Sequence, residues 1–223
     1  MQQLQARKNQ KLFVTSRQEE ILTGSLLGDA YITKRGQLQF EQSDNQKEYL
    51  FWKHTELASI SYRNISLVER FDKRYDKTNR AYRFWSRQYF LSWREKFYIA
   101  NKKIVPKDIQ LTPLALAVWY MDDGCFSDHK CIIATDGFSR EDIEFLQHIL
   151  MEMFGIKTSV KNGSKLLIKR ESFTTFFSTI KPYILSAMRY KIFDPVTTSR
   201  KRDIDLAMVD ITRQYPDYIG IKV

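Results

Sequence analysis

The sequence has few of the residues that form disulfide scaffolds, zinc sites or membrane spans. Only two of its 223 residues are cysteine and three are histidine. Cys125 and Cys131 cannot make a disulfide framework, so we expect a reducing, intracellular compartment of undetermined kind. The histidines show no metal-ligand spacing. No apolar stretch approaches the ~18 residues of a membrane span, and we expect no membrane contact.

Basic residues outnumber acidic ones. There are 36 Lys and Arg against 26 Asp and Glu, which gives a net charge of +10 and an isoelectric point near 9.5. Such a balance points to a polyanionic partner, most commonly nucleic acid, although a basic surface can also serve solubility alone. We set residues 1–16 apart as a basic N-terminal arm, for which a solvated terminus, a DNA contact and a transit sequence all remain open.

A short apolar helix is the clearest element of the sequence. Thr112 suits its N-cap, Pro113 its first position and Gly124 its C-terminal cap. The residues between are apolar on every side, which indicates burial all round. The helix ends in Asp122 and Asp123, where the helix dipole disfavours negative charge, so we expect a compensating cation.

A weaker copy of this pattern lies upstream. Ser16 and Glu19 have capping-box spacing, which predicts a helix from about residue 17 to Gly28. Asp29 then takes the place of Asp123, at an offset of 123 − 29 = 94 residues, close to half of the chain. We interpret the two copies as a duplicated unit.

Small residues on both helices favour close approach and hence a shared site. They are Gly24, Ser25, Gly28, Ala115 and Ala117. Close packing would bring the ends that carry Asp29 and Asp123 together. Two such carboxylates repel unless they are protonated or bridged by a divalent metal, and oxygen-only ligation suits Mg²⁺. The alternative is two buried helices that each end in an ordinary capping Asp, but two motifs in register favour the functional interpretation.

The rest of the pattern predicts an α+β fold in which each half has the order helix, hairpin, helix, hairpin, helix, or αββαββα. We place the first half at 17–110, the second at 111–199 and a C-terminal tail at 200–223. No Gly-, Pro- or Ser-rich linker separates the halves, so we expect them to share one interface. Four hairpins are expected. The first has its turn at 34–36, the second spans 67–87, the third spans 125–135, and the fourth has its turn at Asn162-Gly163. The other helices are expected at 46–60, 90–100, 139–154 and 172–180.

Two segments carry a family resemblance. Leu116 to Gly124 reads LAVWYMDDG, and residues 27–32 read LGDAYI. With shorter matches at 39–41, 111–113, 181–183 and 190–191, they resemble the LAGLIDADG homing endonucleases in their single-chain, two-motif form, and most closely the omega-type intron-encoded enzymes. The likeness runs from about residue 17 to 195. It implies a monomer of two pseudo-symmetric halves, packed through two central motif helices, whose antiparallel, saddle-shaped sheets lie on a long target site in double-stranded DNA.

The resemblance also implies a metal site. The implied ligands are the carboxylates of Asp29 and Asp123 and the backbone carbonyls of Gly28 and Asp122, with Mg²⁺ as the metal and Mn²⁺ as a substitute. Metal held in this way supplies an activated water and neutralises charge on the phosphate.

Further catalytic roles follow from the same resemblance. Lys103 and Lys191 match the family's lysines, which stabilise charge near the scissile phosphate. Asp44 and Asp136 hold the places of its water-positioning residues. The family often has an amide there, and ordinary turn residues are the alternative.

Polar residues on the outward strand faces are candidates for DNA contact, because a two-stranded ribbon fits the major groove. They are Gln37, Gln39, Glu41, Arg83, Trp85, Arg87, Lys157, Lys161, Lys165 and Lys169. A solvated strand face is the alternative for each of them.

These observations favour a metal-dependent, site-specific endonuclease that cuts both strands of DNA. An intron maturase, with intron RNA as its partner, and a non-cleaving DNA-binding regulator are the alternatives on the same fold. A maturase tolerates loss of a catalytic Asp or Lys, whereas all four positions are filled here. A regulator usually carries an extra helix-turn-helix module, for which the short tail leaves little room. Because fold does not fix function, the site must carry the claim.

Overall fold

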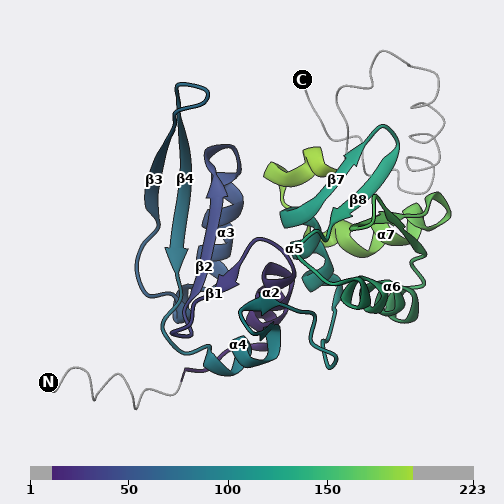
Figure 1. Ribbon diagram of the computed structural model, residues 1–223, viewed down its shortest axis with the longest axis horizontal. Coiled ribbons are helices and arrows are strands. Elements are labelled where there is room, and N and C mark those ends of the chain that lie inside the picture. Colours follow the sequence, from purple (N-terminus) through teal and green to yellow (C-terminus); the bar gives the residue numbers. More distant parts are fainter. Residues whose placement is uncertain (1–11, 193–223) are drawn as a thin grey trace, which may run out of the picture.

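The computed structural model describes residues 12–192 as two halves on either side of two central helices (Figure 1). Most of the predicted basic arm, 1–16, and all of the predicted tail, 200–223, lie outside the described residues. The first half comprises α2 (Ser16–Leu27), β1 (Tyr31–Ile32), β2 (Leu38–Ser43), α3 (Lys47–Glu56), β3 (Ser66–Asp72), β4 (Lys77–Trp85), α4 (Leu91–Phe97), β5 (Tyr98–Ile99) and β6 (Lys102–Lys103). The second comprises α5 (Pro113–Asp123), β7 (Gly124–Ser127), β8 (Lys130–Ala134), α6 (Arg140–Phe154), β9 (Thr158–Lys161), β10 (Lys165–Ile168), α7 (Phe173–Ile180) and the 3₁₀ helix η5 (Ser186–Lys191).

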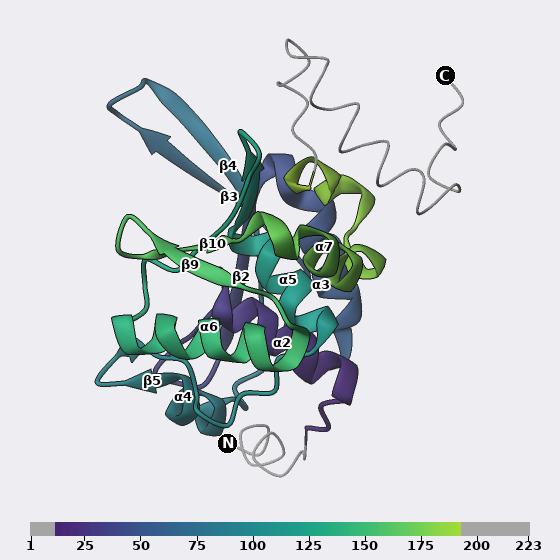
Figure 2. The ribbon, with the colours of Figure 1, turned by 90° about the vertical axis from the view of Figure 1, so that its right-hand side faces the viewer.

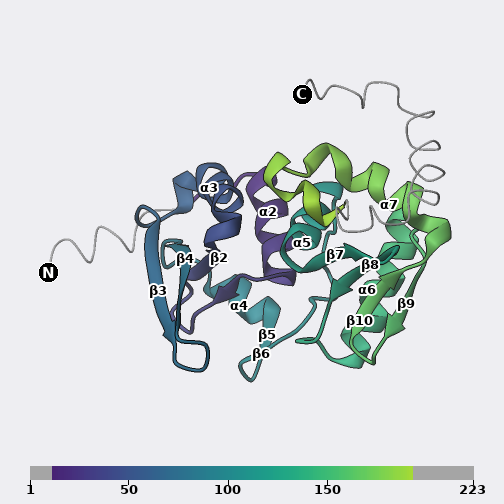
Figure 3. The same cartoon turned by 90° about the horizontal axis from the view of Figure 1, so that it is seen from above.

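The two halves contain matching antiparallel sheets. Their strand orders are β1-β2-β4-β3 and β7-β8-β10-β9, so each strand of one four-stranded sheet has its counterpart in the other. Seen from above, the sheets lie at opposite ends of the molecule with α2 and α5 between them (Figure 3). The α+β fold of two pseudo-symmetric halves is confirmed. In the first half, the β3–β4 hairpin projects well beyond the body (Figure 2).

Helix α5 is apolar on all sides because it serves two cores. One face packs into the first half through Leu114, Val118 and Met121. Another packs into the second half through Leu116, Trp119 and Tyr120. Every residue from 114 to 122 is buried, as the sequence predicted. No helix within residues 12–192 is long and apolar enough to cross a membrane.

The two central helices touch at glycine. A Cβ at Gly24 would lie 2.3 Å from the carbonyl oxygen of Ala115 and 2.7 Å from Cβ of Val118. Such distances leave no room for any side chain, so α2 and α5 approach backbone to backbone. The close packing expected from the small residues is therefore present.

Most helix ends match their sequence signals, and one is displaced by a residue. Thr112 caps α5 and Ser139 caps α6, as predicted. For α2, however, the capping box is formed by Thr15 and Gln18. Our assignment of Ser16 was wrong because both residues can cap a helix, and composition alone does not choose between neighbours.

The end of the predicted helix at 90–100 is also corrected. Helix α4 stops at Phe97, and the next residue, Tyr98, is extended. Ala100 and Asn101 have positive φ, so they form the turn of the short β5–β6 hairpin that carries Lys103. By contrast, the turn at Asn162-Gly163 is confirmed, with φ of 51° and 76°.

Replacement of Gly24 by Ala should destabilise the protein. The new methyl group overlaps the backbone of α5, and such overpacking costs about 1–3 kcal/mol, partly offset by the higher helix propensity of Ala. Urea unfolding measures the loss. Gly137→Ala is the matched control, because a Cβ there meets nothing within 4 Å. Equal stability of the two variants would contradict the contact.

Candidate active site

The two motif aspartates lie at the ends of the paired helices. Asp123 is the last residue of α5 and is half-buried, whereas Asp29 follows the end of α2 and is exposed. Burial and the nearby carboxylates of Asp29 and Asp122 raise the pKa of Asp123 to about 7, against the effect of Lys103 and Lys191. The two halves thus bring their carboxylates within electrostatic reach of each other.

Each half contributes one lysine to this cluster in the same way. Lys103 donates hydrogen bonds to the carbonyl oxygens of Gly28 and Ala30, both at 2.8 Å. Lys191, at the end of η5, donates to the carbonyl oxygen of Asp122 at 2.7 Å. Burial lowers the pKa of both lysines, although the neighbouring carboxylates oppose this. Both lysines thus contact the backbone just before a motif aspartate, as the duplication predicts.

Two further polar residues complete the cluster, and sequence reasoning missed both. Gln42 donates to Oδ2 of Asp29 at 2.8 Å. Lys53 donates to both carboxylate oxygens of Asp122, at 2.7 and 2.9 Å. Each had a signal, because Gln42 falls on the apolar face of β2 and Lys53 follows Tyr49 by one helical turn on the buried face of α3.

The two predicted water-positioning residues lie in turns. Asp44 begins a 3₁₀ turn after β2 and forms an exposed ion pair with Lys47 at 3.4 Å. Asp136 accepts a hydrogen bond from the hydroxyl of Ser164. Among the described residues, neither side chain is hydrogen-bonded to Asp29 or Asp123, whereas Gln42 of the first half is bonded to Asp29.

Several predicted DNA-binding residues share one face of the first sheet. Gln39 lies opposite Trp85 and Glu41 opposite Arg83, so all four side chains point to the same side. Glu41 accepts hydrogen bonds from Arg83 at 2.6 Å and from Arg70 at 3.0 Å, and these arginines lower its pKa. A hollow of about 530 Å³ extends along this face from Asp29.

Two residues of the first half that were predicted to bind DNA, Gln37 and Arg87, lie just outside the strands. Gln37 donates to the carbonyl oxygen of Ser86 at 2.9 Å, which ties its amide to the sheet edge. Arg87 follows β4 and donates to the carbonyl oxygen of Ser61 at 3.4 Å.

The second sheet presents the predicted lysines. Lys161 and Lys165 lie opposite each other on β9 and β10. Lys157 and Lys169 flank these strands and are exposed, and Lys157 pairs with Glu171 at 3.4 Å. The predicted DNA-binding residues of this sheet are thus all lysines, whereas those of the first sheet include the acidic Glu41.

This chain matches a known family over most of its length. The family model described as LAGLIDADG DNA endonuclease matches residues 19–176. The chain belongs to this family. Its two LAGLIDADG motifs are therefore residues 22–30 and 116–124.

Relatives of two kinds are similar to this LAGLIDADG protein. Cytochrome b mRNA maturase bI2 of Debaryomyces hansenii is 32% identical over 78% of this chain and 72% of the maturase. The maturase of the same name from Saccharomyces cerevisiae is 30% identical over 77% of this chain, which spans 46% of that longer protein. Among solved structures, the homing endonuclease I-WcaI bound to its DNA recognition sequence has a TM-score of 0.78 and 27% identity, covering 88% of this chain and 94% of that one.

The donor set of the LAGLIDADG site fits a hard divalent cation. Within residues 12–192, no three His, Cys, Asp or Glu side chains group as metal ligands. The donors at the helix ends are the carboxylates of Asp29 and Asp123 and the backbone carbonyls of Gly28 and Asp122. Mg²⁺ characteristically uses one or two carboxylates and keeps waters or phosphate oxygens for its other positions. The carbonyls of Gly28 and Asp122 accept hydrogen bonds from the lysines, but each carbonyl oxygen has a second lone pair.

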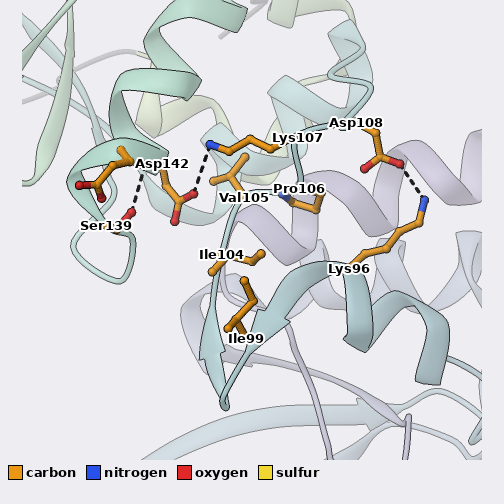
Figure 4. Close-up of a pocket in the computed structure, with 10 residues that line it drawn as sticks. Lys96, Ile99, Ile104, Val105, Pro106, Lys107, Asp108, Ser139 and Asp142 are labelled. Carbon is orange, nitrogen blue, oxygen red and sulfur yellow. Dashed lines mark hydrogen bonds and ion pairs between the residues drawn. The ribbon is translucent and has the colours of Figure 1, made fainter.

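A separate hollow of about 400 Å³ lies between the β5–β6 hairpin, the segment that joins the halves and the start of α6 (Figure 4). Lys96 pairs there with Asp108 at 3.0 Å, and Lys107 lies 4.0 Å from Asp142. None of the motif aspartates or their lysines lines it. This hollow is therefore separate from the cluster at the helix ends.

The raised pKa of Asp123 predicts a pH-dependent stability difference. When the pKa of an acid rises from 3.8 to about 7 on folding, the free energy of unfolding of the protein falls as the pH increases from 3.8 to about 7. Above about pH 7 the whole of this loss of stability is present. Asp123→Asn removes this loss of stability. In metal-free buffer at pH 8 the variant should therefore melt several degrees higher than wild type, and its free energy of unfolding should be higher by up to about 4 kcal/mol.

Thermal unfolding at several pH values tests this. Near pH 4 the two proteins should melt nearly alike, because the folded carboxyl is protonated and that pH is close to the unfolded-state pKa of 3.8, so little of this loss of stability has developed. Asp76→Asn, at an exposed turn, controls for the change in side chain. A gain that does not vary between pH 4 and 8 would contradict the account.

Proposed function

We propose that this protein is a site-specific endonuclease that cuts both strands of duplex DNA as a monomer, using Mg²⁺ held by Asp29 and Asp123. One observation carries the proposal. Two carboxylates and two lysines, one of each from either half, meet at the end of the helix pair that joins the two sheets. A duplex has two strands related by a local two-fold axis, and a site with the same symmetry suits it.

The bound metal supplies an activated water and neutralises charge on the phosphate. The carboxylates of Asp29 and Asp123 would hold it, with the carbonyl oxygens of Gly28 and Asp122 as further ligands. In the free protein the two lysines and a proton on Asp123, whose pKa is raised to about 7, offset the charge of the motif aspartates. A divalent cation would compete with this proton.

Lys103 and Lys191 would act directly on the scissile phosphates. Each ammonium is held by a carbonyl next to a motif aspartate, so its position relative to that aspartate is fixed. A fixed ammonium stabilises the charge that develops on the phosphate oxygens more strongly than a mobile one, because it needs no reorganisation during the reaction.

The two sheets would read the target. Gln39, Glu41 and Arg83 share a face with Arg70 on neighbouring strands, and arginine and glutamine form bidentate contacts with guanine and adenine in the major groove. Glu41 holds both arginines in the free protein, so DNA must compete for them. Lysines on the second sheet suit phosphate contacts.

A maturase is the second candidate. The two cytochrome b mRNA maturases that are 30% and 32% identical to this chain favour it. The two functions are separable, because RNA binding needs no metal carboxylates. Binding of intron RNA by Asp29→Asn and Asp123→Asn variants that no longer cut DNA would establish it as an additional function.

Cleavage of a duplex library that contains intronless gene junctions tests the endonuclease proposal. With Mg²⁺, wild type should cut one sequence on both strands, and Mn²⁺ should replace Mg²⁺. Asp29→Asn and Asp123→Asn should each slow cutting by about 10³-fold or more while DNA binding persists, because a metal ligand is lost. Lys103→Met and Lys191→Met should slow it by about 10²-fold.

Asp108→Asn serves as the control, since this exposed carboxylate pairs with Lys96 away from the site. If wild type binds the DNA tightly but does not cut it with either Mg²⁺ or Mn²⁺, the endonuclease proposal is wrong, and a maturase or a DNA-binding regulator remains.

A further inference from the structure

The two motifs differ at one buried position. Residue 28 of the first motif is Gly, and its counterpart in the second, at 28 + 94 = 122, is Asp. A Cβ at Gly28 would lie 2.5 Å from Cβ of Asp122 and 2.6 Å from its Oδ2. The missing side chain on one helix therefore makes room for the carboxylate of the other.

This carboxylate faces the first half and is fully buried there. Lys53 donates to both of its oxygens, and the two side chains are only 2% and 0% exposed. The ammonium also lies 4.4 Å from the centre of the Tyr49 ring. Since taking two charges out of water costs about as much as their attraction returns, a buried ion pair is weak evidence for a purely stabilising role.

The Asp122 carboxylate is connected to Asp29 by one direct hydrogen bond and by a bridge through the amide of Gln42. The backbone N–H of Asp29 donates to Oδ2 of Asp122 at 3.4 Å. Gln42 shares its amide between Oδ1 of Asp122, at 3.3 Å, and Oδ2 of Asp29, at 2.8 Å. Asp122 thus holds both the backbone of Asp29 and the amide that orients its carboxylate.

In the part of the chain that the structure describes, hydrogen bonds hold the carboxylate of Asp29 but not that of Asp123. None of the hydrogen bonds found within residues 12–192 ends on the Asp123 carboxylate, whose surroundings act on it through burial and charge. The two halves of the site therefore differ in how firmly each aspartate is held.

We propose that Lys53 is a positioning residue for Asp29. It neutralises Asp122 and keeps that carboxylate where it orients Asp29 and Gln42. The inference rests on the proposed endonuclease function and deepens it. Metal binding by Asp29, and cutting of the strand that this half serves, depend on Lys53, whereas the other strand depends on it much less.

The test uses the double variant Lys53→Met/Asp122→Ala. Removing both charges avoids an unpaired buried ion, and Ala keeps the backbone carbonyl of residue 122. On a supercoiled plasmid bearing the target, nicked circles should accumulate because one strand is cut about 10–100-fold more slowly, and Mn²⁺ affinity measured by electron paramagnetic resonance should fall by a similar factor. DNA affinity should stay unchanged. Lys96→Met/Asp108→Ala removes an exposed ion pair as the matched control.

Wild-type cutting of both strands by the double variant, with unchanged Mn²⁺ affinity, would overturn the proposal. If circular dichroism shows the double variant to be unfolded, Gln42→Leu removes the amide bridge between Asp122 and Asp29 and leaves the ion pair and the Asp29 N–H bond intact, so it must show a one-strand defect of the same kind. If wild type binds Mn²⁺ but cuts no DNA, the endonuclease function fails, and the Mn²⁺ affinities alone decide the role of Lys53. If the wild type binds no Mn²⁺, the proposed role of Lys53 is refuted.

Discussion

The contact between α2 and α5 is the constraint on which the site depends. Because Gly24 has no side chain, the two helix backbones touch, and their ends arrive at the same place. Neither aspartate could meet its counterpart if a side chain separated the helices. The same contact places α5 between two hydrophobic cores, which is why its sequence is apolar on every side. Packing and chemistry are thus set by one interface.

The two similar halves form a near-symmetric site, but the hydrogen bonds that hold the two motif aspartates differ. The halves match in strand order, in the lysine that reaches a motif carbonyl and in the placement of the motif aspartate. They differ at Gly28 and Asp122, where one half supplies space and the other a buried charge. Lys53 then balances that charge from the first half. Around the helix ends, the carboxylates of Asp29, Asp122 and Asp123 therefore stand beside three ammonium groups, those of Lys53, Lys103 and Lys191.

The sequence was informative wherever a local rule decides the structure. The caps of α5 and α6 and the Asn162-Gly163 turn depend on neighbouring residues only, and they were predicted correctly. Lys53 was missed because its partner is 69 positions away, and nothing local says that a lysine on an apolar helix face has found a carboxylate. The end of α4 was misplaced for a similar reason, since pairing of β5 with β6 outweighs the helical preference of its last residues.

The central claim is that both motifs hold one shared metal site. Anomalous scattering from Mn²⁺ in crystals of the complex with target DNA tests it most directly. The account predicts density at the ends of α2 and α5, in contact with the carboxylates of both Asp29 and Asp123 and with phosphate oxygens of the DNA. Density at only one aspartate, or none at the helix ends while the DNA is bound, would contradict it.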